Sequence, residues 1–162
     1  MLFRSGCATG NWPHVPIQQG AGPAIDAWFG DWDVGGATPL ASVLDYLSTH
    51  VDDIWGAGHG DGYAVVLSDG ADTCDCSQFD RDEQPEDNVR CVSDLLTAST
   101  RALAAQRIHT HVIGYAYADD PRELEAIAAN GDTGADMPLS AGSEASLTLA
   151  FEQILRDVKY CQ

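Results

Sequence analysis

Two short segments constrain the fold of this chain more than any other feature of its sequence. Residues 63–67 are a continuous apolar run, and Ser68, Asp69 and Gly70 end it with turn-forming residues. Residues 108–115 make a second segment of the same kind. Short apolar runs bounded by turn residues are typical of strands buried on both faces. Because each face of such a strand must be covered, we expect a sheet packed between two layers of helices.

Segments with helical spacing of apolar residues alternate with these strands. Thr38 and Pro39 suit the N-cap and the first position of a helix, Ser143 is expected to cap the final helix, and Gly131 is a C-cap signal. The expected helices are residues 21–29, 38–50, 89–106, 121–129 and 143–159, and the expected further strands are residues 1–4 and 137–140. Strands separated by helices imply crossover connections. We therefore predict an α/β fold with a three-layer, doubly wound and mostly parallel sheet, helices on both faces, and a single domain over residues 1–162.

The charge balance of the chain is strongly acidic. Its 25 Asp and Glu residues against 8 Lys and Arg give a formal net charge of −17. Such a surface repels a phosphate backbone, so we do not expect nucleic acid as a partner. It fits cation binding, and it also fits plain solubility. No stretch approaches the roughly 18 uninterrupted apolar residues of a spanning helix, so we expect no membrane span in this chain.

The cysteines indicate an oxidising compartment. There are five of them: Cys7, Cys74, Cys76, Cys91 and Cys161. Three lie in one polar region, where burial as small apolar side chains is least expected, so disulfides are the simplest explanation. The alternative is a zinc site of Cys74, Cys76 and Cys91 with His59 or His109, but the paired Cys-x-x-Cys spacing is missing. We predict that at least one of Cys74 and Cys76 pairs with Cys91. The odd number leaves one cysteine that either has its partner upstream or is a free thiol.

Thr38 and Asp69 are the candidate ligands of a metal ion. Asp69 directly follows the first apolar strand, and ligands of parallel sheets bind at the carboxyl ends of the strands. Thr38 places a hydroxyl at the start of a helix. A hard cation such as Mg²⁺ prefers oxygen ligands in an octahedral array, which a hydroxyl, carboxylates and waters supply. Each residue also has a purely structural interpretation, since Thr38 can act as a helix cap and Asp69 with Gly70 as a turn.

The acidic loop at residues 71–88 is a weaker candidate for cation binding. Its carboxylates do not follow the spacing of an EF-hand, so we interpret them as a solvated run. They are Asp72, Asp75, Asp80, Asp82, Glu83, Glu86 and Asp87.

The order of two motifs resembles a known family. Residues 35–40 read Gly-Gly-Ala-Thr-Pro-Leu, and residues 65–70 read Val-Val-Leu-Ser-Asp-Gly. Together they resemble the second and third parts of the metal-ion-dependent adhesion site of von Willebrand factor A-type domains. Residues 108–114 resemble the family's next strand, and residues 120–128 resemble the helix that follows it. The resemblance covers most of residues 36–158.

This resemblance implies a protein-binding or adhesion module that is not an enzyme. In the family, a cation (Mg²⁺, or Ca²⁺ or Mn²⁺) completes its shell with a carboxylate from the protein ligand, and Thr38 and Asp69 match two of its motifs. The cysteine-rich loop and the acidity suggest an extracytoplasmic bacterial protein, secreted or at the cell surface, and the loop from Asp69 and Gly70 to Cys74 resembles that of bacterial A-type domain proteins. The family's first metal motif, Asp-x-Ser-x-Ser, is absent from this sequence. We therefore expect that the family's first strand is missing and that Thr38 and Asp69 supply only part of the metal shell.

Two other functions compete with this reading. One is a metal-free, purely structural A-type domain. The other is an α/β hydrolase of the haloacid dehalogenase type, with Asp69 as nucleophile or metal ligand. Such an enzyme needs a second Asp two residues later and a downstream lysine, but position 71 is Ala71 and the only lysine is Lys159 in the last expected helix.

Overall fold

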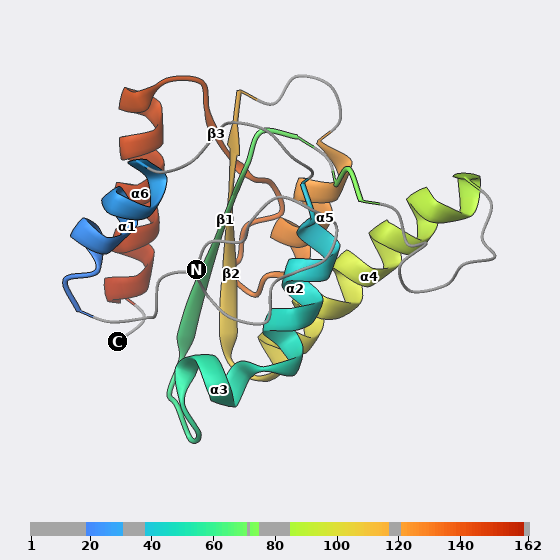
Figure 1. The fold of residues 1–162 in the computed structure, drawn as a ribbon, viewed down its shortest axis with the longest axis horizontal. Coiled ribbons are helices and arrows are strands. Elements are labelled where there is room, and N and C mark those ends of the chain that lie inside the picture. Colours follow the sequence, from blue (N-terminus) through green and yellow to red (C-terminus); the bar gives the residue numbers. More distant parts are fainter. Residues whose placement is uncertain (1–18, 31–37, 71, 75–84, 117–120, 161–162) are drawn as a thin grey trace.

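The computed structural model describes residues 19–30, 38–70, 72–74, 85–116 and 121–160 (Figure 1). Their helices and strands are α1 (Gly22–Gly30), α2 (Leu40–Thr49), α3 (Val51–Trp55), β1 (Gly62–Ser68), α4 (Pro85–Ala105), β2 (Ile108–Tyr115), α5 (Arg122–Asn130), β3 (Leu139–Ala141) and α6 (Glu144–Tyr160). The strand expected at residues 1–4 lies outside the described residues. None of the helices in the described ranges is long and apolar enough to span a membrane.

The strands form a parallel sheet in the order β1-β2-β3. β1 and β2 pair in parallel from Gly62 opposite Ile108 to Ser68 opposite Gly114. β3 then pairs with the carboxyl-terminal end of β2, with Leu139 opposite Ile113. The prediction that the two apolar segments are parallel neighbours is confirmed. Within the described part of the chain, β1 is an edge of the sheet.

Helices cover the sheet on two faces and enclose a separate apolar core on each. Side chains of α2, α4 and α5 pack on one face, where Leu44, Leu96 and Leu124 are almost fully buried. α6 covers the other face over β2 and β3, where Ile113 of β2 packs with Ile154. Figure 1 shows this separation, with α6 on one side of the strands and α2, α4 and α5 on the other. The predicted three-layer α/β arrangement is therefore present. Val65 and Leu67 of β1 are exposed on the face that α6 covers elsewhere, so the prediction that this strand is buried on both faces is wrong.

The start of α2 differs from the sequence prediction. The helix begins at Leu40, and Pro39 occupies the N-cap position without a side-chain cap hydrogen bond. The prediction that Thr38 is the N-cap is therefore wrong. The physical reason is tertiary, because the Asp72 carboxylate accepts a hydrogen bond from the Ala41 backbone N–H at 2.7 Å and takes over the capping role. At the last helix the prediction is confirmed, since the Ser143 hydroxyl accepts a bond from the Ser146 N–H.

Candidate functional site at the carboxyl end of the sheet

Asp69 lies in a turn directly after β1, at the carboxyl end of that strand. The Ser68 hydroxyl closes this turn, because it donates to the Gly70 carbonyl at 2.9 Å and accepts from the Gly70 N–H at 3.3 Å. Ser68 is buried, whereas Asp69 is exposed. A short turn fixed by its own buried hydroxyl thus presents the Asp69 carboxylate to solvent, which suits a ligand for a soluble cation.

Thr38 lies in a segment that runs beside the loop following Asp69. The Thr38 N–H donates to the Thr73 hydroxyl at 2.6 Å, and the Thr73 N–H donates to the Thr38 carbonyl at 3.1 Å. Two residues that are 35 positions apart are therefore joined by reciprocal bonds. The chain just before α2 and the chain just after β1 consequently form one local structure.

Asp72 connects this loop to the start of α2. Its carboxylate accepts hydrogen bonds from the Ala41 N–H at 2.7 Å and from the Cys74 N–H at 2.6 Å. Burial raises the pKa of the Asp72 carboxyl, while hydrogen bonds from the backbone of Ala41, Cys74 and Leu40 lower it. The interpretation of Asp72 as part of a solvated run is wrong, because this side chain is half-buried and bonded. The loop carboxylates from Asp75 to Glu83 lie outside the described residues.

Glu123 holds the same loop from the opposite side. It belongs to the first turn of α5, and its carboxylate accepts a hydrogen bond from the Asp72 backbone N–H at 2.6 Å. Sequence reasoning assigned no role to Glu123 or to this use of Asp72. Both bonds join residues more than thirty positions apart, so no local spacing in the sequence could have revealed them.

The side-chain oxygen atoms of this region could supply part of the ligand shell of a metal ion. Both oxygens of the Asp72 carboxylate accept hydrogen bonds from backbone N–H groups, and Thr38 and Asp69 stay the candidate ligands that the sequence motifs indicate. Among the described residues, no group of three or more His, Cys, Asp and Glu side chains could hold a metal ion. Mg²⁺ keeps several waters and is commonly bound through one or two carboxylates. One carboxylate and one hydroxyl match that chemistry only if waters or a partner group complete the octahedron.

Of the cysteines in the alternative zinc site, Cys74 and Cys91 are not available to a metal. Cys74 and Cys91 are both disulfide-bonded, so neither supplies a thiolate to a metal. Cys74 is also nearly fully buried. The expectation of oxidised cysteines is met for these two residues. The pairing of Cys91 with Cys74 or Cys76 stays a prediction, and Cys76 lies outside the described residues.

His109 and His111 lie on the same face of β2, as their alternation in the strand predicts. Both face Tyr63 of β1, with ring centroids 5.4 Å and 6.3 Å apart. His109 is anchored through its Nδ1 atom, which lies 2.8 Å from the Asp132 carbonyl oxygen and 3.3 Å from the carboxylate of the same residue. These contacts give the imidazole of His109 a structural role.

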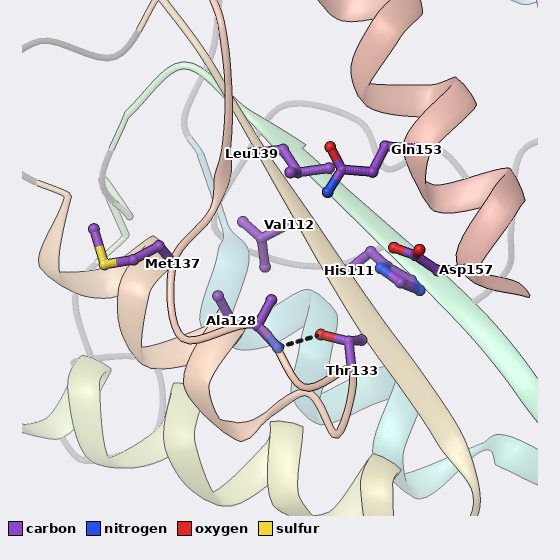
Figure 2. A pocket seen from close by; sticks show the side chains of 9 residues that line it. His111, Val112, Ala128, Thr133, Met137, Leu139, Gln153 and Asp157 are labelled. Atoms are coloured by element: carbon purple, nitrogen blue, oxygen red, sulfur yellow. Dashed lines mark hydrogen bonds between the residues drawn. The ribbon is translucent and has the colours of Figure 1, made fainter.

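A small cavity lies beside His111, away from the turn that carries Asp69. Its volume of about 30 Å³ has room for a water molecule and not for a cofactor. Figure 2 shows the His111 ring near the Asp157 carboxylate, with Gln153 of the same helix above them. Burial lowers the pKa of His111, while the negative charge of Asp157 raises it by a smaller amount. This cavity therefore bears on stability rather than on ligand binding.

No protein-family model matches this chain, and no curated protein matches it. The resemblance of residues 35–40 and 65–70 to A-type domain motifs therefore stays a prediction from the sequence.

Proposed function

We propose that this chain is a protein-recognition module of the A-type domain kind, with a partial metal-ion-dependent adhesion site formed by Thr38 and Asp69. The observation that supports this most directly is the pair of reciprocal bonds between Thr38 and Thr73, which joins the start of α2 to the loop that follows Asp69. Carboxyl ends of parallel strands are where α/β sheets bind ligands. A hydroxyl and an exposed carboxylate at such an edge suit Mg²⁺, Ca²⁺ or Mn²⁺.

The protein ligand is expected to contribute a carboxylate, because the site itself has few anionic oxygens. Asp69 supplies one carboxylate, and Mg²⁺ is commonly bound through one or two. A carboxylate of a protein ligand would provide the second. The chain itself carries a net charge of −17, so an acidic group approaches it favourably only when a cation lies between them. Recognition of the partner should therefore depend on the cation.

Other properties of the chain agree with a binding module outside the cytoplasm. Disulfide-bonded Cys74 and Cys91 are typical of proteins in oxidising compartments. The second Asp that a dehalogenase-type hydrolase needs is replaced by Ala71. We therefore propose adhesion or protein binding without catalysis.

A magnesium titration of the 162-residue chain tests this function. Binding followed by calorimetry should be weak and should be lost in Asp69→Ala, because that variant removes the only charged ligand of the site. Asp136→Ala is the matched control, since it removes one exposed carboxylate from the loop before β3 and leaves Thr38 and Asp69 unchanged. Equal magnesium binding by Asp69→Ala and the wild type would refute the proposal. A wild type that binds no magnesium would favour the metal-free structural alternative.

A further inference from the structure

The loop that carries Asp69 is held on two sides by a single residue. The side chain of Asp72 bonds to the start of α2 through Ala41, and its backbone N–H bonds to Glu123 at the start of α5. A third bond, from the Cys74 N–H to the other carboxylate oxygen, fixes the chain on the far side of Asp72. Three bonds of 2.6 to 2.7 Å thus converge on one residue, three positions after Asp69.

Helix capping alone does not account for this arrangement. A cap requires an acceptor for the free N–H groups of α2, and the Asp72 carboxylate supplies that acceptor through Ala41. The bond between the Asp72 N–H and Glu123 adds nothing to α2, because it joins the loop to a different helix. Its effect is to fix the backbone of the loop between α2 and α5. Bonds to ionised acceptors of this length are among the stronger hydrogen bonds of proteins.

The two candidate ligands, Thr38 and Asp69, belong to the two segments that Asp72 joins. Thr38 precedes α2, whose first turn Asp72 caps, and Asp69 precedes Asp72 in the loop. We propose that Asp72, held by Glu123, positions the Asp69 carboxylate relative to Thr38 and so sets the cation affinity of the site. This inference rests on the proposed function. In this proposal Asp72 is a positioning residue, since each of its carboxylate oxygens accepts a hydrogen bond from a backbone N–H and so fixes the loop.

Substitution of Asp72 should therefore weaken cation binding in a protein that is still folded. Asn has one acceptor oxygen where Asp has two, and its NH₂ group cannot accept a hydrogen bond. One of the two backbone N–H groups, of Ala41 or of Cys74, therefore loses its acceptor. Outer partners of metal ligands typically contribute about 10–100-fold to affinity, so we expect a loss in that range for Asp72→Asn. Glu123→Ala should give a similar loss, whereas Glu123→Gln should largely retain binding because its side-chain oxygen still accepts from the Asp72 N–H.

The experiment is a magnesium titration of the full chain followed by amide NMR. Four variants are compared with the wild type: Asp72→Asn, Glu123→Ala, Glu123→Gln and the charge-matched control Asp136→Asn. The same spectra report hydrogen exchange at the Ala41 and Cys74 amides, which the Asp72 carboxylate protects. We expect Asp72→Asn to lose both this protection and the affinity, and Asp136→Asn to lose neither. A purely structural role would lower the unfolding temperature and leave the magnesium affinity of the folded protein unchanged.

The outcomes separate this inference from the function on which it rests. A wild type that shows no magnesium response overturns the proposed function together with the inference. A wild type that binds magnesium, with equal affinity in Asp72→Asn after amide protection is lost, overturns only the positioning role. Unprotected amides at Ala41 and Cys74 in the wild type would also overturn it. If Asp72→Asn does not fold, the comparison between Glu123→Ala and Glu123→Gln decides the question, since both variants leave the cap of α2 in place.

Discussion

Substitution of Gly131 by alanine should destabilise this protein because of the close approach between α5 and β2. Gly131 follows α5 with φ −80°, a conformation that any residue adopts, so backbone freedom does not explain the glycine. The added Cβ would instead collide with the backbone carbonyl oxygen of Thr110 and lie 3.2 Å from the carbonyl oxygen of Ile127. Both obstacles are backbone atoms, which cannot rotate away as a side chain can. The segment after α5 must therefore move away from β2.

That movement disturbs a buried hydrogen bond. The Thr110 N–H donates to the Gly131 carbonyl at 2.8 Å, and Thr110 is fully buried. Crowding of a packed interior costs about 1–3 kcal/mol, and an unpaired buried N–H costs about 1–3 kcal/mol more. The lower entropy of the unfolded alanine chain offsets about 0.4–1 kcal/mol. We expect a net loss of about 1–6 kcal/mol, which lowers the unfolding temperature of a chain of this size by about 2–4 °C for each kcal/mol.

Thermal and urea unfolding of Gly131→Ala measure this loss, and Gly134→Ala is the matched control. Gly134 has φ 75° and open space where a Cβ would lie, so alanine there costs only the left-handed backbone conformation, about 1–2 kcal/mol. The larger loss of stability should therefore occur at Gly131, although its backbone angle is the ordinary one. A Gly131→Ala protein that is as stable as Gly134→Ala would refute the steric reasoning.

Two further predictions concern pH and redox state. Burial lowers the pKa of His111 below 6.5, so the unfolded chain binds this proton more tightly and the free energy of unfolding falls as the pH drops below about 6.5. Urea unfolding at about pH 7 and about pH 5 should show a smaller fall of this free energy in His111→Gln than in the wild type. Equal changes in the two proteins would contradict this. We also predict that Cys91 pairs with Cys74 or Cys76, which closes a loop of about 15 residues and stabilises the fold by about 3 kcal/mol in the chain-entropy model. Peptide mapping without reduction checks the pairing, and three freely alkylated thiols would exclude it.

The sequence determined the layers of the fold and the parallel pairing of its two longer strands. Residues 62–68 and 108–115 form parallel neighbours, and helices cover both faces of β2, as the apolar pattern predicts. Only one face of β1 is covered, since Val65 and Leu67 are exposed. Short-range signals such as the Ser143 cap were also readable, since the atoms involved are only three residues apart. The candidate ligands Thr38 and Asp69 came from motifs with a definite order along the chain.

Only the tertiary structure decided what holds the candidate site together. Thr38 has the residue type of an N-cap, yet α2 starts after it because Asp72, 31 positions from Ala41, supplies a better-placed acceptor. Gly131 has the residue type of a left-handed C-cap, yet it is required by the nearness of Thr110. In both cases the residue type suggests a local capping role, but a contact with a distant segment explains the residue's actual place in the structure. Residue types report the preferences of a short peptide, whereas hydrogen-bond acceptors and free volume are shared among all the segments that meet in the fold.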